Sequence, residues 1–164
     1  MGSSAWNSPL PKLGLALTVT LLVAVPVAMA DEREDYVAKV EPICKANTEA
    51  NSRILKGVKE QVKEEKLVPA GKRFIRASTA LGKTVTQISN VPQPSEDAVK
   101  LTKWIGYLKQ EKTFLQKIGK ALKDENKFQA QKLAVQLNKN NNKANNTVIS
   151  FGFDECRIDS SRFI

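Results

Sequence analysis

The chain has 164 residues, with 26 Lys and Arg against 17 Asp and Glu and no histidine, which gives a net charge of +9. Its two methionines are Met1 and Met29, so residues 31–164 contain neither histidine nor methionine. This composition excludes the usual ligand sets of haem, copper and catalytic zinc, and it excludes nucleophilic triads that depend on histidine. We expect no cofactor, no metal and no enzymatic activity, although a lysine-based mechanism stays open.

Residues 1–30 have the pattern of a secretory signal peptide. A polar lead with one basic side chain, Lys12, precedes an apolar run over residues 13–30. The run ends in Ala28-Met29-Ala30, a small-x-small pattern typical of a cleavage site. We expect cleavage near Ala30 and a secreted or cell-envelope-associated protein. An uncleaved membrane anchor is the alternative, because the run is about as long as a minimal membrane span.

The first expected helix covers about residues 32–66. Apolar side chains recur along it at a helical spacing, and acidic residues crowd its start, where the helix dipole favours anions. Pro42 is anomalous because proline cannot donate to the helical hydrogen-bond ladder. We interpret it as a kink in a longer helix, with a helix that begins near Glu41 as the alternative. Glu41 and Lys45 have the spacing of an ion pair on the outer face.

Three further helices are expected, at about residues 70–89, 95–123 and 127–151. Short breaks that contain proline, glycine or polar residues separate them, and no segment has the alternation typical of a strand. Ser95 is a natural N-cap for the third helix. Gly152 is a plausible stop after the fourth helix.

The apolar stripes of these helices include Phe128 in the fourth and a row of leucines in the third. The leucines recur at intervals of seven residues, at Leu101, Leu108, Leu115 and Leu122. Such a row is compatible with a dimeric leucine zipper or with the core of a helical bundle. We favour the bundle core and a monomer, because a lysine occupies one intervening heptad position and the chain offers other helices to pack against.

Two cysteines in an exported protein most simply form one disulfide, here between Cys44 and Cys156. Free thiols or an intermolecular bridge are the alternatives. In an up-down-up-down bundle the start of the first helix lies beside the end of the fourth, where the two cysteines are placed. The sequence therefore predicts an all-α domain over residues 31–159, an up-down-up-down four-helix bundle closed by one disulfide, with a frayed tail at residues 160–164.

Asparagine is concentrated in the fourth helix, although it is a mediocre helix former. Helical spacing turns Asn141 inward, and it places Asn47 and Asn51 of the first helix on the face between Cys44 and Ile54. We expect these amides and Asn145 to meet in a buried polar layer that fixes the register of the helices. The functional alternative is a polar ligand pocket inside the bundle, lined by Asn47, Asn51, Asn141 and Leu137.

Charge separates the first helix from the others. Residues 31–66 carry a net charge of −1, whereas residues 71–94, 95–123 and 126–153 each carry +4. We expect this basic surface to contact an anionic cell-wall polymer or a membrane surface, with a merely solvated face as the alternative. Because the lysines lack interleaved exposed aromatic residues and arginine forks, we expect no nucleic acid partner. The candidate contacts are Lys103, Lys109, Lys117, Lys120, Lys132, Lys139 and Lys143.

Two short stretches carry a resemblance to a known group of proteins. PICKAN at residues 42–47 and FGFDEC at residues 151–156 contain an early I-C-x-x-N and a late G-[FL]-x-x-C. This layout resembles uncharacterised small secreted helical proteins that are common in actinobacteria. The resemblance implies export and a disulfide, and it implies no activity.

Together these patterns favour an exported, non-enzymatic binding protein that contacts an anionic cell-envelope polymer through its basic helices. A small-molecule carrier with a polar pocket inside the bundle is one alternative. A helix–helix interaction module that uses the leucine row of the third helix is the other.

Overall fold

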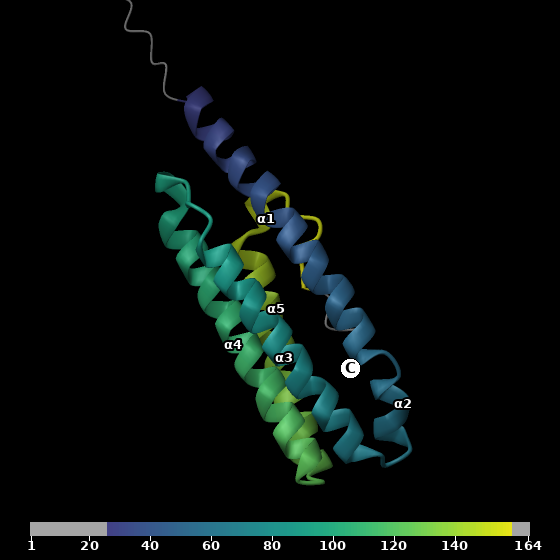
Figure 1. Cartoon of the computed structure of the whole chain (residues 1–164). Helices are drawn as coiled ribbons and strands as arrows, with labels where there is room; N and C mark the ends of the chain where they lie inside the picture. The colour runs from purple at the N-terminus through teal and green to yellow at the C-terminus, as the bar shows by residue number, and fades with distance from the viewer. Residues whose placement is uncertain (1–25, 159–164) are drawn as a thin grey trace, which may run out of the picture.

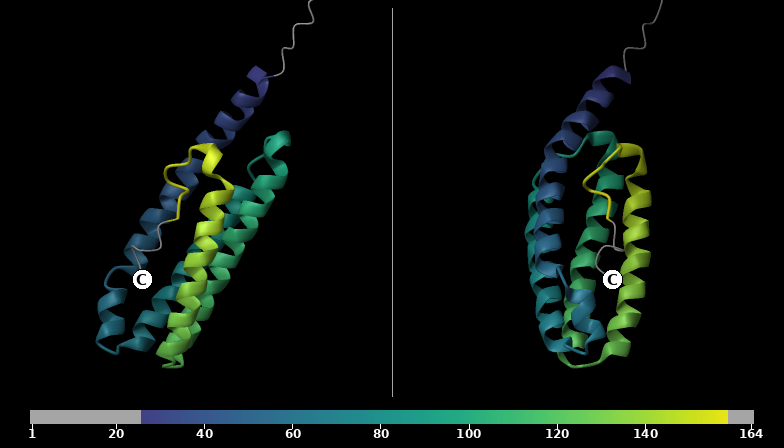
Figure 2. Two further views of the ribbon diagram at one scale, coloured as in Figure 1. Left: turned by 180° about the vertical axis from the view of Figure 1, so that it is seen from behind. Right: turned by 90° about the vertical axis from the view of Figure 1, so that its right-hand side faces the viewer.

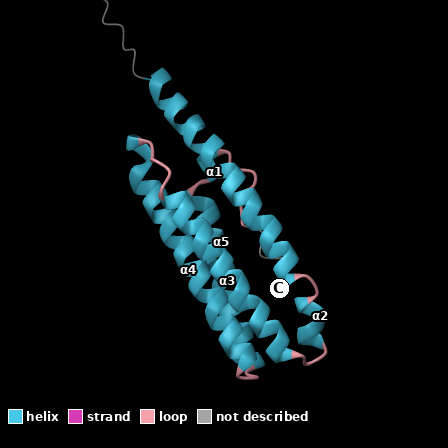
Figure 3. Cartoon of the chain, viewed as in Figure 1, coloured by secondary structure: helices cyan, strands magenta, loops and turns pink. Residues whose placement is uncertain are grey.

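The computed structural model describes residues 26–158, with side chains from residue 32 onward. Most of the predicted signal peptide and the predicted frayed tail at residues 160–164 lie outside the described residues. Within them the chain is helical and contains no strand, which confirms the all-α class (Figure 3). No helix in this range is long and apolar enough to cross a membrane.

Residues 26–158 form five α-helices and two 3₁₀ turns, and Figure 1 shows how the helices are arranged. Four of the helices are long and follow the order of the four predicted ones. The elements are α1 (Pro26–Leu55), α2 (Val58–Lys63), α3 (Leu67–Ser89), η1 (Ser95–Asp97), α4 (Ala98–Lys123), α5 (Lys127–Thr147) and η2 (Ile149–Phe151).

The first predicted helix, 32–66, is wrong as one element, because it is two helices. Gly57 has a φ of 76°, in the left-handed region that a right-handed helix cannot contain, and it separates α1 from α2. Pro42, by contrast, lies inside α1 without ending it, as the preferred interpretation of a longer helix required.

Three other predicted boundaries shift by a few residues. α3 begins at Leu67 and not at residue 70, because Pro69 falls in its first turn, where a missing N–H costs no hydrogen bond. Ser95 is not an N-cap, since it is the first residue of η1. α5 ends at Thr147 and not at residue 151, and the following 3₁₀ turn stops at Gly152, whose φ is 67°.

α4 lies between α3 and α5, and α1 lies along α3 (Figures 1 and 2). α1 and α5 have little direct contact. Residues 152–158, here called the C-terminal segment, pass between them (Figure 2). The first and last helices are therefore linked through this segment.

The core is formed by apolar side chains from all the helices and from the C-terminal segment. Trp104 stacks on Phe153 with ring centroids 5.3 Å apart, and Phe153 stacks on Phe151 at 5.6 Å. The prediction that Phe128 belongs to the apolar stripe of the fourth helix is wrong, because 71% of this residue is exposed. The row Leu101, Leu108, Leu115 and Leu122 is buried within this one chain.

α3 and α4 pack tightly against each other at a pair of glycines. A Cβ atom on Gly119 would lie 2.7 Å from the carbonyl oxygen of Gly71, and one on Gly71 would lie 2.5 Å from the carbonyl oxygen of Gly119. Any larger side chain at either position would meet backbone. α3 therefore meets α4 near its own start, at Gly71.

The start of α4 is tied to α1 by an ion pair. Arg33 donates to both carboxylate oxygens of Asp97, at 2.7 and 2.9 Å, and its guanidinium lies 5.0 Å from the ring centroid of Phe151. Asp97 is buried, and the hydrogen bond to it raises the pKa of Arg33. A buried carboxylate held by two guanidinium hydrogen bonds fixes where α1 meets η1 and η2.

Candidate functional site

The predicted disulfide between Cys44 and Cys156 is confirmed. It joins α1 to the C-terminal segment, with the two Cα atoms 5.0 Å apart and 112 positions apart in sequence. Because both cysteines of the chain are in this bond, there is no free thiol. The disulfide brings the end of the chain against the middle of α1.

Hydrogen bonds hold the C-terminal segment on both sides of the disulfide. On the α1 side, the carboxylate of Glu41 accepts from the backbone N–H groups of Asp154, at 2.7 Å, and Glu155, at 2.8 Å. On the α5 side, Asn145 exchanges two hydrogen bonds of 2.9 Å with the backbone of Ile158. The predicted outer-face pair of Glu41 with Lys45 is therefore wrong, because the Glu41 carboxylate binds the segment instead.

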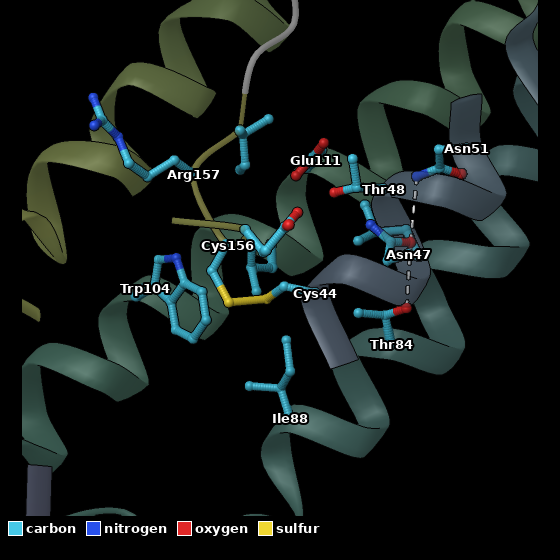
Figure 4. A pocket seen from close by; sticks show the side chains of 14 residues that line it. Cys44, Asn47, Thr48, Asn51, Thr84, Ile88, Trp104, Glu111, Cys156 and Arg157 are labelled. Atoms are coloured by element: carbon cyan, nitrogen blue, oxygen red, sulfur yellow. Dashed lines mark hydrogen bonds between the residues drawn. A yellow bond between two sulfur atoms is a disulfide. The ribbon is translucent and has the colours of Figure 1, made fainter. Parts of the chain in front are cut away.

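A cavity of about 70 Å³, partly open to solvent, lies beside the C-terminal segment and is bordered by α1, α3 and α4 (Figure 4). The disulfide, Trp104 and aliphatic side chains of α3 and α4 form its apolar wall. Its polar wall comes mainly from Asn47, Thr48 and Asn51 of α1, Thr84 of α3 and Glu111 of α4.

The amides of α1 form a short hydrogen-bonded chain at this wall. Asn47 Oδ1 accepts from Asn51 Nδ2 at 3.3 Å and from Thr84 Oγ1 at 3.2 Å (Figure 4). Two buried polar atoms of the lining residues have no partner among the described residues: the acceptor Asn51 Oδ1 and the donor Trp104 Nε1. Since buried polar groups are normally hydrogen-bonded, these two atoms are exceptions within residues 26–158.

Glu111 is the cavity residue that sequence reasoning missed. It is half-buried, makes no ion pair with a described residue, and burial raises the pKa of its carboxyl from 4.5 to about 8. α3, α4 and α5 together carry fifteen Lys and Arg, and Glu111 is their single acidic residue. Its spacing from Trp104 and Leu108 places it on the inward stripe of α4, a signal that was available in the sequence.

The predicted polar layer does not form as one network. Asn47 and Asn51 line the cavity, whereas Asn141 and Leu137 do not. Asn141 is buried as predicted, but it contacts Asn140 on its own helix, with 3.5 Å between Asn140 Nδ2 and Asn141 Oδ1. Asn140 also donates to the backbone carbonyl of Tyr107 on α4 at 3.0 Å.

Asn145 of that predicted layer holds the C-terminal segment instead of meeting α1. The segment occupies the space between α1 and α5, so it separates the amides of α5 from those of α1 (Figure 2). The asparagines of α1 and of α5 therefore belong to different sites.

The predicted basic contacts lie on the outside of α4 and α5. All seven are exposed, and none of them forms an ion pair with a described residue. They are Lys103, Lys109, Lys117 and Lys120 of α4 and Lys132, Lys139 and Lys143 of α5.

Two exposed apolar side chains lie on this basic surface. Phe128 is an exposed aromatic residue among the lysines, with the ammonium of Lys132 lying 5.5 Å from its ring centroid. Val135, one heptad further along α5, is also exposed. The surface is therefore basic with two apolar side chains, and the expected lack of exposed aromatic residues is wrong.

Among the described residues, no group of three or more His, Cys, Asp or Glu side chains is placed to hold a metal ion. Comparison of the chain with protein-family models, with curated proteins and with solved structures found no match.

Proposed function

We propose that the protein is an exported, non-enzymatic binding protein that contacts an anionic polymer of the cell envelope through the lysines of α4 and α5. The observation that carries this proposal is the state of these lysines. All seven are exposed and lack an ion-pair partner among the described residues, and α5 contains no acidic residue. The one acidic residue of α4, Glu111, lines the cavity and so does not neutralise the outer surface.

Several unpaired lysines on adjacent helices suit a polymer with repeated negative charges. Each exposed contact contributes only about 0.2–1 kcal/mol, so useful affinity requires several contacts at once. A repeating anionic chain supplies them along α4 and α5, which lie side by side. The exposed Phe128 adds apolar area to the same surface.

We also infer that the four long helices form an up-down-up-down bundle, behind a signal peptide that is cleaved near Ala30, and that the protein acts as a monomer. Short connections between helices that are neighbours in space support this topology. The residue pattern of positions 1–30 supports the signal peptide. Mass spectrometry of the exported chain checks the cleavage: a chain that begins at Asp31 agrees, and a chain that retains residues 1–30 contradicts it.

The test of the polymer proposal is binding of the full chain to immobilised poly(glycerol phosphate), with dextran as the neutral control. A variant with Gln at Lys109, Lys117, Lys132 and Lys139 removes four charges from α4 and α5. The lost contacts should weaken binding about fourfold or more. Raising the salt concentration should weaken binding of the parent, because exposed charges are screened.

A matched control variant carries Gln at Lys45, Lys56, Lys59 and Lys63, four exposed lysines of α1, α2 and their connection. It has the same net charge as the first variant but leaves α4 and α5 unchanged. We expect its affinity to stay close to that of the parent. Equal loss in both variants would show that only net charge matters, and no binding of the parent at low salt would refute the proposal.

A further inference from the structure

Glu111 is an acidic residue on a basic group of helices, yet it does not serve there as the partner of a lysine. It is the single acidic residue among the fifteen basic ones of α3, α4 and α5, yet it pairs with no lysine among the described residues. It lines the cavity beside the C-terminal segment and is half-buried there. A half-buried carboxyl group without a cation is less well solvated than an exposed one, so a positively charged occupant of the cavity would stabilise it.

Two buried polar atoms of residues that line the cavity lack partners. Asn51 is only 8% exposed, and its Oδ1 accepts no hydrogen bond from a described residue. Trp104 is fully buried, and its Nε1–H donates to none. Asn51 and Trp104 therefore carry buried polar atoms without a described partner, and both residues line the same small space as Glu111.

The size of the cavity limits what occupies it. A water molecule needs about 10–15 Å³ of such volume, so 70 Å³ holds several waters or a molecule of a few heavy atoms. Pockets for drug-sized ligands measure about 300–1,000 Å³. A metabolite-sized carrier site, one of the expected alternatives, does not fit this volume.

The chemistry of the walls selects the kind of small molecule. The carboxyl group of Glu111 and the hydroxyl oxygen of Thr48 are acceptors, and Glu155 also lines the cavity. The remaining wall is apolar, formed by the indole ring of Trp104 and by Leu and Ile side chains. Acceptors beside an apolar wall suit a cation that donates several hydrogen bonds and carries a short hydrocarbon stem.

We propose that the cavity binds a primary ammonium group on a short aliphatic stem. Glu111 is its counter-ion, Thr48 Oγ1 beside Glu111 accepts one of its hydrogen bonds, and the stem lies against the apolar wall (Figure 4). This site is independent of the lysine surface proposed above, because those lysines lie on the outside of α4 and α5.

The charged groups around Glu111 are few. The cavity residues of α1 and α3 are uncharged, and Glu111 is the only charged residue that α4 contributes. The C-terminal segment contributes Glu155 and Arg157, and Arg157 extends away from Glu111 (Figure 4). Because burial raises the pKa of Glu111 to about 8, ammonium binding at neutral pH releases a proton from this carboxyl group. Affinity should therefore increase by up to tenfold per pH unit until about pH 8.

The test is a titration of the full chain with ethylammonium chloride, followed by the indole Nε1–H resonance of Trp104 in NMR spectra. A ligand of three heavy atoms binds at best with a dissociation constant of about 0.5–1 mM, so the titration extends to about a hundred times that concentration. Ethanol is the uncharged match in size, sodium chloride controls for ionic strength, and tetramethylammonium is a cation that is bulkier and has no N–H donor.

We expect a saturable shift of the Trp104 resonance with ethylammonium and no saturable shift with ethanol, sodium chloride or tetramethylammonium. Glu111→Gln keeps the shape of the side chain and should weaken ethylammonium binding at pH 8 at least about tenfold. Glu155→Gln, at the edge of the cavity, should change it less. The parent chain in weak buffer should also release protons as it binds, a readout that needs no variant. The proposal is overturned by no saturable shift, by ethanol binding as tightly, or by unchanged affinity of Glu111→Gln.

Discussion

Replacing Gly119 with alanine should destabilise the protein, although alanine is the better helix former. Gly119 lies inside α4 where that helix crosses α3, and the new Cβ atom would lie 2.7 Å from Gly71 O, 2.7 Å from Ile75 Cγ1 and 3.0 Å from Ile75 N. Two of these three atoms belong to the backbone, so no side-chain rotation relieves the contact. The two helices must move apart along the length of their packed surface.

The size of the effect follows from two opposing contributions. Gly to Ala inside a helix is favourable by about 1 kcal/mol, whereas overpacking a tight contact usually costs about 1–3 kcal/mol and occasionally more. Because the clash involves backbone, we expect a cost at the upper end of that range. The net loss in free energy of unfolding should then be about 1–2 kcal/mol.

Urea denaturation followed by far-UV circular dichroism measures this difference. Gly106→Ala is the matched control, because Gly106 lies in the same helix and a Cβ atom there meets nothing within 4 Å. It should raise the free energy of unfolding by about 0.5–1 kcal/mol. A Gly119→Ala variant as stable as the parent or more stable would refute the close approach of α3 and α4.

The double variant Gly71→Ala/Gly119→Ala adds a second check. Once the helices have separated to accept one methyl group, the second methyl group meets a wider gap. The loss in free energy of unfolding of the double variant should therefore be smaller than the sum of the two single losses, as expected for residues in contact.

Three further predictions concern other parts of the fold. Replacing Cys44 and Cys156 together with alanine should lower the free energy of unfolding by about 2–5 kcal/mol, because the loop that the bond closes is long; an unchanged urea midpoint would contradict this. Tyr36→Phe should leave stability unchanged or raise it by up to about 1 kcal/mol. The buried hydroxyl group of Tyr36 has no partner among the described residues, and burial raises its pKa to about 12. A loss of more than about 1 kcal/mol would show that this hydroxyl group has a hydrogen-bond partner. The Glu111 carboxyl has a pKa of about 8 in the folded chain against 4.5 unperturbed, so the folded chain retains a proton that the unfolded chain loses, and stability falls as pH rises through this window. Glu111→Gln should match the parent near pH 4 and exceed it at pH 8, by less than about 5 kcal/mol because the group is partly exposed; a difference that does not change with pH would contradict the shift.

Local features of the sequence were enough to predict α3, α4 and α5 to within about four residues at each end. The spacing of apolar residues and the prolines near residues 92–94 predicted the end of α3 at Ser89, and the polar turn at residues 124–126 predicted the end of α4 and the start of α5. These features act within a few residues, so no knowledge of the fold is needed to interpret them. The disulfide was predictable for another reason, since the sequence predicts export and two cysteines in an exported chain have one simple pairing.

Gly57 shows where local reasoning was incomplete. It separates α1 from α2 through a positive φ, yet a glycine inside a helical pattern is often tolerated. Pro42 was the stronger signal for a helix end in the sequence, yet it lies within α1. The chain turns near Gly57 because α2 packs against α3, which only the tertiary structure reveals.

The candidate cavity, too, was predictable only in part. Helical spacing alone placed Asn47 and Asn51 on the inner face of α1 and left the lysines outside, since long charged side chains remain in water. Spacing did not determine which inner faces would meet. The C-terminal segment, bound to α1 by Glu41 and to α5 by Asn145, separates the two groups of asparagines and leaves Asn51 facing a cavity with Glu111. The contacts of Glu41 join residues more than a hundred positions apart, and Asn145 binds a backbone that no residue pattern marks. The sequence by itself therefore determined three of the four long helices, the disulfide and the exposed charge. The packing between distant segments decided where the first helix divides, where a small cavity remained and which groups line it.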